Sequence, residues 1–172
     1  MPSSSRIFSY TIGLAIAALL ILLAPQWARA QANQYYEPPS SYSNAELPDR
    51  DFSGKVLQMT EFSNTNLRRS KFKAADLRGA VMSASSLRDA DLTGANLAYA
   101  LAERVDFGGA NLSDTIWTEA VLLFSTFENT EIAGADFTDA ILDGAQVKEL
   151  CQVARGVNPQ TGIATRDSLG CR

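Results

Sequence analysis

The chain has 172 residues, with 15 Lys and Arg, 19 Asp and Glu, no His, and a net charge of −4. This length allows one domain with short appendages. A chain without His lacks the most common acid–base group and metal ligand, and it cannot form a Ser–His or Cys–His nucleophile pair. The sequence also has no Gly-rich phosphate loop preceding a helix. The composition therefore argues against an enzyme.

Residues 1–30 have the pattern of a secretory signal peptide. Arg6 supplies the positive charge, residues 12–24 form an apolar run that Pro25 ends, and Ala28-Arg29-Ala30 is an A-x-A cleavage site. The run is shorter than the ~20 residues of a membrane span. We expect cleavage after Ala30 and export of the chain. The alternative is an uncleaved N-terminal anchor, through which alone we expect membrane contact.

Residues 31–46 are polar and contain two prolines, as in a linker. Tyr35, Tyr36 and Tyr42 make the segment more aromatic than a linker requires. We therefore expect it to serve as a linker and N-terminal cap, partly covering the segment that follows.

Residues 47–147 repeat with a period of five. A mostly small residue precedes each large apolar residue by two positions, and an acidic or amide residue often lies between them, as in Ala90-Asp91-Leu92 and Ala95-Asn96-Leu97. The central positions, of which Ala102 alone is small, are Leu47, Phe52, Leu57, Phe62, Leu67, Phe72, Leu77, Met82, Leu87, Leu92, Leu97, Ala102, Phe107, Leu112, Trp117, Leu122, Phe127, Ile132, Phe137, Leu142 and Val147.

A period of five fits neither an α-helix nor a flat strand. Residues five apart are about 140° apart around a helix, so the central residues would spiral around it. In a strand, an odd period would send alternate central residues to opposite faces. A chain that turns a corner every five residues sends all of them inward, and exact self-similarity of this kind indicates a solenoid.

The pattern resembles that of the pentapeptide-repeat proteins, A(D/N)LXX, most clearly over residues 90–97. The resemblance implies an all-β solenoid: a right-handed quadrilateral β-helix with four pentapeptides per coil and about five coils. Residues 20 apart would then lie above one another on one side of the helix.

Residues 148–172 form the predicted C-terminal cap. Val147, Leu150, Cys151 and Ala154 have helical spacing, and Gly156 and Pro159 end that helix. A further turn is possible over residues 165–169. In an exported protein, two cysteines most simply form one disulfide, here between Cys151 and Cys171. A redox-responsive bond is the alternative, although no C-x-x-C spacing is present.

The tail resembles the C-terminal region of thylakoid-lumen pentapeptide proteins of cyanobacteria and chloroplasts, in Leu150-Cys151, Asn158-Pro159 and residues 168–171. This resemblance implies a disulfide-braced helical tail that caps the β-helix. It implies no reaction.

One outer side of the implied β-helix is apolar. The residues before the central positions are mostly polar, except on this side, where Leu123 and Phe124 extend an apolar column. Such a patch indicates a contact surface for a partner or for self-association. Alternatively, the N-terminal segment covers it, or β-branched residues simply suit stacked strands. The candidate face comprises Val81, Leu101, Val121, Ile141, Leu123 and Phe124.

Charge is polarised along the repeats. Residues 50–88 contain eight cations and three anions, whereas residues 89–149 contain two cations and twelve anions. A dipolar rod could orient on a charged partner or stack head to tail, but dispersed solubilising charges would give the same counts. The candidate basic patch comprises Arg68, Arg69, Lys71, Lys73 and Arg88.

The repeated carboxylates do not form a predicted metal or catalytic site. Asp76, Asp91, Asp106 and Asp136 occupy the ordinary acidic position of the repeat, and those on one side are three coils apart. Metal and acid–base chemistry need groups within a few Å of each other. We therefore predict no catalytic residues, no metal, no cofactor and no small-molecule substrate.

The sequence favours a non-catalytic, exported scaffold that binds an unidentified protein partner or a second copy of itself. The thylakoid lumen is the favoured compartment, and the periplasm is the alternative. Some cytoplasmic pentapeptide-repeat proteins mimic DNA and occupy gyrase. A DNA-mimic topoisomerase inhibitor is therefore the alternative if this chain is cytoplasmic. The signal peptide and the basic first coils make nucleic-acid binding the less favoured expectation.

Overall fold

The computed structural model describes residues 41–172. The predicted signal peptide over residues 1–30, its cleavage site, and Tyr35 and Tyr36 of the predicted linker lie outside these residues.

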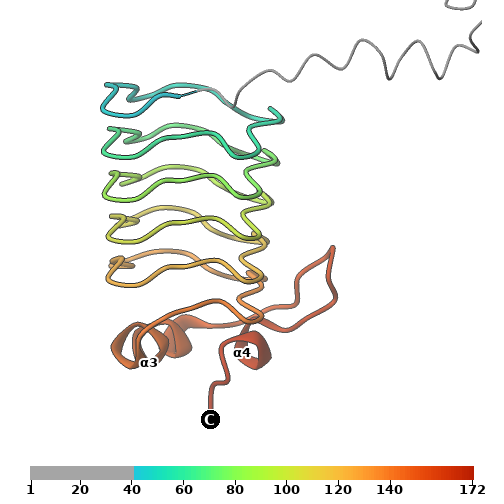
Figure 1. Ribbon diagram of the computed structural model, residues 1–172. Helices are drawn as coiled ribbons and strands as arrows, with labels where there is room; N and C mark the ends of the chain where they lie inside the picture. The colour runs from blue at the N-terminus through green and yellow to red at the C-terminus, as the bar shows by residue number, and fades with distance from the viewer. Residues whose placement is uncertain (1–40) are drawn as a thin grey trace, which may run out of the picture. The chain divides into compact units, whose positions relative to one another are not determined.

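From Ser41 onward the chain winds in coils of 20 residues (Figure 1). Every fifth residue from Ser41 to Ile141 takes part in a parallel β-bridge with residues 20 positions away, as in the pairs Ser41–Glu61 and Val121–Ile141. Over these residues the β-structure consists of single-residue bridges. A bridge every five residues, repeated after 20, gives each coil four sides with one pentapeptide on each. We number the sides by their first bridge residues: side 1 from Glu46, side 2 from Asp51, side 3 from Val56 and side 4 from Ser41.

A tight turn forms each corner between two sides. The second residue after each central position has positive φ, without exception from Asn44 (61°) to Asp139 (56°). The corner is closed by a backbone hydrogen bond such as that from Lys55 N to Phe52 O, 3.1 Å. Positive φ at the third of four turn residues is the requirement of a type II turn. The corners therefore reset the direction of the chain, so that every central residue points inward.

The central residues form the core, as predicted. Those from Leu57 to Phe137 are buried, and the small residues two positions earlier, such as Ala75 and Ala95, are buried beside them. Aromatic residues 20 apart stack: Phe52 on Phe72 with ring centroids 4.9 Å apart, and Phe107 on Phe127 at 5.4 Å. Each coil thus packs on its neighbours in sequence, as expected for a solenoid.

The coils begin earlier than the predicted residue 47. Ser41 and Glu46 are bridged, and Tyr42 stacks on Phe62 with centroids 5.1 Å apart. The prediction that residues 41–46 belong to the linker is therefore wrong. Tyr42 lies five residues before Leu47 and is itself a central residue, in a segment whose polar composition masked the period.

The coils end earlier than the predicted residue 147. Helix α3 spans Gly144–Val153, so it takes up four residues assigned to the repeat. Asp143 caps it by accepting hydrogen bonds from Ala145 N and Gln146 N, while the Gln146 side chain accepts from Asp143 N. This capping box starts a helix before the next corner can form. A short second helix, α4, spans Thr165–Ser168.

The two helices lie over the end of the last coil (Figure 1). Leu150 from α3 and Leu169 just after α4 are buried and belong to the same hydrophobic cluster as the coil core. Among the described residues, no helix has the length and apolar character that a membrane crossing requires.

Polar side chains complete the hydrogen-bond ladder where the coils stop. The Gln146 amide donates to Leu122 O and Ser125 O, both at 2.8 Å. The Asn158 amide donates to Thr115 O at 3.1 Å and Gly134 O at 2.9 Å, and Ser168 Oγ accepts from Phe137 N at 3.0 Å. In a further coil, backbone groups would have bonded to Ser125 O and Phe137 N, so the Gln146 and Ser168 side chains take the place of that coil. The Asn158 amide adds bonds to carbonyl groups at corners of the coils, of which Thr115 O also accepts from Asp136 N.

Candidate interaction faces

Side 4 carries the predicted apolar column. Its β-bridges link Glu61, Val81, Leu101, Val121 and Ile141 in succession. The stacked bridges thus bring the four predicted apolar residues of this side into one line. Leu101 is 42% exposed and Ile141 50% exposed, whereas Val81 and Val121 are half-buried.

The corner toward side 1 widens this column. Phe124 is 61% exposed and Leu123 is half-buried. The Arg104 guanidinium lies 5.4 Å from the centroid of the Phe124 ring. A cation over an aromatic face is a weakly favourable contact that leaves the other face of the ring available.

The opposite corner, toward side 3, carries two apolar residues that sequence reasoning missed. Tyr99 is 57% exposed and Met59 is 58% exposed. Both lie at the positive-φ corner position, Tyr99 at 63° and Met59 at 54°. The sequence did contain a signal, since Tyr99 is two residues before Leu101, but a corner position does not lie directly beside a central residue. From here on, the apolar face means Val81, Leu101, Val121, Ile141, Leu123, Phe124, Tyr99 and Met59.

Carboxylates border the apolar face in its later coils. Glu119 and Asp139 are exposed at the corner toward side 3, two residues before Val121 and Ile141 respectively. Glu103 lies half-buried at the other corner. The face thus combines an apolar centre with an acidic border.

The predicted basic residues gather around side 2, where carboxylates interrupt them. Arg69 Nε donates to Asp49 Oδ1 at 2.7 Å, and Arg88 pairs with Asp106 at 3.2 Å. Lys71 is bridged between Asp51 and Asp91 on side 2. Lys71, Arg68 and Lys73 are exposed and make no ion pair among residues 41–172. The basic patch remains a prediction, and three of its five residues make no ion pair within residues 41–172.

Ion pairs stabilise the charged form of two carboxylates in the early coils. The side-chain hydrogen bonds from Arg69 hold the pKa of Asp49 below its ordinary value. Hydrogen bonds from Arg78, and a further one from Gln58, lower the pKa of Asp76 from 3.8 to about 2. These carboxylates are therefore ionised at neutral pH and neutralise the nearest cations.

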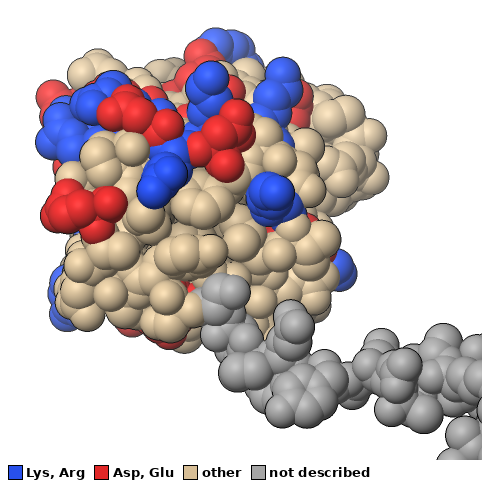
Figure 2. Space-filling view, turned by 90° about the horizontal axis from the view of Figure 1, so that it is seen from above, with Lys and Arg blue, Asp and Glu red and all other residues tan. Residues whose placement is uncertain are grey.

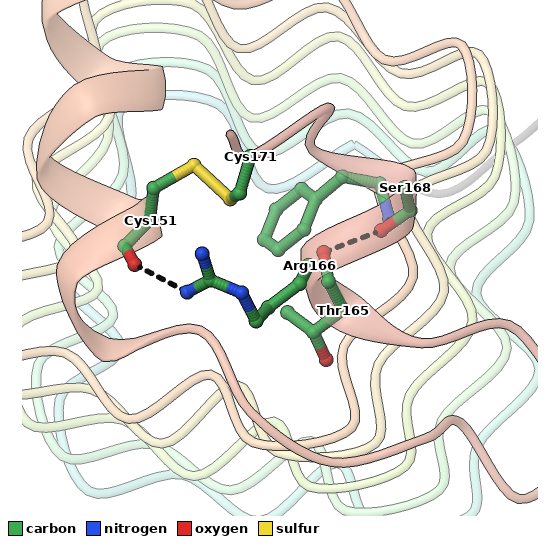
Figure 3. The surroundings of a disulfide bond; sticks show 6 residues. Cys151, Thr165, Arg166, Ser168 and Cys171 are labelled. Carbon is green, nitrogen blue, oxygen red and sulfur yellow. Dashed lines mark hydrogen bonds between the residues drawn. A yellow bond between two sulfur atoms is a disulfide. The ribbon is translucent and has the colours of Figure 1, made fainter.

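A disulfide links α3 to the C-terminus, as predicted. The sulfur atoms of Cys151 and Cys171 are bonded, with their Cα atoms 5.6 Å apart. The Arg166 guanidinium points toward this bond and donates to Cys151 O at 3.1 Å (Figure 3). The loop that the disulfide closes includes Asn158 and Ser168, so the bond holds these ladder-ending side chains at the last coil. A redox-responsive role for it remains a prediction.

Among residues 41–172, no three His, Cys, Asp or Glu side chains come together as a metal site would require. Asp76, Asp91, Asp106 and Asp136 occupy bridge positions on three different sides. Asp76 and Asp136 share side 3 but are three coils apart.

The sequence matches the family described as pentapeptide repeats, in eight copies over residues 51–83, 60–97 and 106–144, which together make up half of the chain. The chain belongs to the pentapeptide-repeat family, whose members form right-handed quadrilateral β-helices.

Particular relatives come from Arabidopsis thaliana. The crystal structure of a pentapeptide repeat protein from its thylakoid lumen is 42% identical, with a TM-score of 0.51, over 76% of this chain and 91% of that one. Thylakoid lumenal protein TL20.3 is 56% identical over 41 residues, which are 24% of this chain and 15% of that protein. Thylakoid lumenal 15 kDa protein 1 is 53% identical over 47 residues, 27% of this chain and 21% of that protein. The chain thus spans about a fifth or less of these two proteins.

Proposed function

We propose that the protein is a non-catalytic interaction module of the thylakoid lumen, and that it binds a lumenal protein through the apolar face. In this proposal it is a right-handed quadrilateral β-helix of about five coils, closed by its C-terminal helical segment. The lumenal location is supported by the Arabidopsis matches, which are all to thylakoid lumenal proteins.

One observation carries the proposal: exposed aromatic and long apolar residues occupy positive-φ corners on both borders of the apolar face. Tyr99 and Phe124 have φ of 63° and 64°, and each is more than half exposed. Positive φ is costly for bulky residues and is best tolerated by Gly, Asn and Asp. Neither core packing nor β-propensity favours these residues there, so binding is the better explanation.

The distribution of exposed apolar residues agrees with this reading. Among the coil residues, the large apolar side chains that are exposed are Val56, Met59, Tyr99, Leu101, Phe124 and Ile141. All except Val56 lie on side 4 or its two corners. Because Glu119 and Asp139 border the face, we expect a partner that presents an apolar surface flanked by Lys or Arg.

The test is a comparative pull-down from lumenal extract with the purified exported protein. The double variant Leu101→Asp, Phe124→Asp places two charges in the apolar face, and Asp tolerates the positive φ at position 124. The matched control is Asn111→Asp, Asn129→Asp, which adds the same two charges at a bridge position of side 2 and at a positive-φ corner.

We expect the parent and the control to retain a partner that the apolar-face variant loses at least tenfold. Equal recovery by all three folded proteins would show that the apolar face does not bind. The DNA-mimic alternative applies to a chain retained in the cytoplasm, and fractionation of the native protein would decide that point.

A further inference from the structure

The two ends of the coil stack differ in their hydrogen bonding. At the last coil, the side chains of Gln146 and Ser168 pair with Ser125 O and Phe137 N, backbone groups that have no backbone partner among residues 41–172. At the first coil, the backbone N–H groups of Glu46 and Val56 make no hydrogen bond with any residue between 41 and 172.

One coil later, the equivalent groups are all paired. Asn66 N donates to Ala45 O, Lys71 N to Arg50 O and Asp76 N to Lys55 O. Asp51 N, like Glu46 N and Val56 N, has no such partner among the described residues. The first coil therefore presents a row of β-edge donors and acceptors, which in natural proteins pair with another strand unless they are blocked.

The same end presents apolar surface. Tyr42, Leu47 and Phe52 pack against the core on one side and are half-buried, whereas the central residues of the next coil are fully buried. Val56, a bridge residue of side 3, is 75% exposed and is the most exposed large apolar side chain among residues 41–172. Within the part of the chain that the structure describes, the first coil thus combines unpaired β-edge groups with partly exposed apolar side chains.

The sequence before Ser41 does not offer another coil in the same register. Counting back in fives from Asn44, the next positive-φ corner position is residue 39, which is proline. The proline ring fixes φ near −65°, outside the positive range that the corners from Asn44 to Asp139 share. We therefore consider a second copy of the chain as the source of a partner strand.

A second copy of the chain can supply such a strand in only one way. Head-to-tail stacking would require a free last coil, but α3, α4 and the Cys151–Cys171 disulfide cover that end. The first coils of two copies can instead face each other across a two-fold axis. Such an assembly is complete with two copies. The facing strands then run antiparallel, and such pairs are at least as stable as the parallel pairs within each stack.

The charges at this end permit the contact. Glu46 and Asp51 lie on the first coil with Arg50 and Lys55, and all four are exposed. Figure 2, which views the stack from the first-coil end, shows both signs of charge on this end with uncharged surface beside them. A two-fold contact places the same surface of both copies face to face. Opposite charges can meet there only if that surface carries both positive and negative side chains.

We propose that the protein forms a two-fold homodimer in which the first coils of two copies pair end to end, through the backbone edges of residues 46–56 and the apolar residues beside them. This inference does not depend on the apolar face, which remains available on the outer side of each copy.

The test is the oligomeric state of the purified exported protein, measured by sedimentation over a hundredfold range of concentration. We expect a monomer–dimer equilibrium in the parent. Val56→Lys places a charge at the edge and should raise the dimer Kd at least tenfold. Thr126→Lys, at an exposed bridge position of side 1 in a later coil, is the matched control and should leave the Kd unchanged.

Hydrogen exchange keeps the proposal testable if Val56→Lys fails to fold. In the parent, the amides of Glu46, Asp51 and Val56 should exchange more slowly at high than at low concentration. A parent that stays monomeric, or amides that exchange alike at both concentrations, would overturn the proposal. So would a dimer that dissociates in the Leu101→Asp, Phe124→Asp variant but persists in Val56→Lys.

Discussion

At the residue scale, the corner position sets the most demanding local requirement. Every corner between residues 44 and 139 has positive φ, and most of these positions are occupied by residues other than glycine. An L-residue in the left-handed region is strained by about 1–2 kcal/mol relative to the right-handed one. The repeat therefore tolerates a small strain at many corners, which the stacked coils hold in place.

Exchanging glycine and alanine at two corners should shift stability in opposite directions. A Cβ on Gly94, with φ of 68°, would meet no atom within 4 Å, so Gly94→Ala tests the backbone alone. We expect it to lower the free energy of unfolding by about 1 kcal/mol, and Ala84→Gly, at φ of 58°, to raise it by up to about 1 kcal/mol. Urea denaturation of both variants checks this. A stabilising Gly94→Ala would show that the corner adapts by losing its positive φ.

At the scale of elements, the C-terminal segment takes the place of a sixth coil. Its helices cover the core with Leu150 and Leu169, and its polar side chains pair with backbone groups of the last coil. Without it, the last coil would have unpaired backbone groups, as the first coil has among residues 41–172. The capping box at Asp143 marks the point where the chain changes from coil to helix.

Gln146 should be the most sensitive polar residue of α3. It is buried and bonds to Leu122 O, Ser125 O and Asp143 N. Gln146→Leu leaves Ser125 O and Asp143 N without a partner among the described residues, whereas Leu122 O keeps its bond from Ser125 N. At about 1–3 kcal/mol for each buried unpaired group, the substitution should lower the free energy of unfolding by roughly 2–4 kcal/mol. Gln152→Leu, at an exposed position of the same helix, should change it by less than about 0.5 kcal/mol.

Thermal and urea denaturation followed by circular dichroism would measure both variants. Similar losses in the two would mean that the helix as a whole, and not the hydrogen bonds of Gln146, stabilises the end of the coils.

At the scale of the whole molecule, stability comes from neighbouring coils. Phe72 is fully buried and stacks on Phe52 of the first coil. Phe52 is half-buried and, among residues 41–172, has a coil on one side only. In a stack of this kind each coil contacts only the coils next to it. The contribution of a core residue to the free energy of unfolding therefore depends on its position along the axis.

Truncating the two phenylalanines should therefore have unequal effects. Phe72→Ala should cost about 3–5 kcal/mol, as for a fully buried aromatic residue, and Phe52→Ala distinctly less, because its neighbours surround it incompletely. The comparison requires protein dilute enough to be monomeric, since an end-to-end dimer would cover Phe52. Equal costs in the monomer would contradict the one-dimensional view of this fold.

Much of the fold could be predicted because the period of five is explicit in the sequence. The 20-residue bridges, the buried central residues, the helix near Leu150 and the disulfide all follow from spacing and residue type. The prediction of where the repeat begins and ends was less accurate. Tyr42 lay in a polar segment, and Gln146 and Val147 continued the spacing although Asp143 starts a helix there.

The candidate site was only partly accessible to sequence reasoning. Leu101 and Ile141 could be aligned because they are 40 residues, or two coils, apart. Tyr99 lies at a corner, and its position beside Leu101 depends on the turn geometry. The predicted cations gather near side 2, yet the pairing of Arg69 with Asp49 and of Arg88 with Asp106 depends on side-chain conformations.

The sequence alone determined the repeat, the inward central residues and the class of protein, because a strict period leaves one way to bury every large apolar side chain. The tertiary structure decided which polar side chains end the ladder, which apolar residues meet on side 4, and that the first coil has an unpaired edge among residues 41–172. These features arise from contacts between residues about 20 or more positions apart, or at the ends of the stack, where the repeat no longer dictates the neighbour.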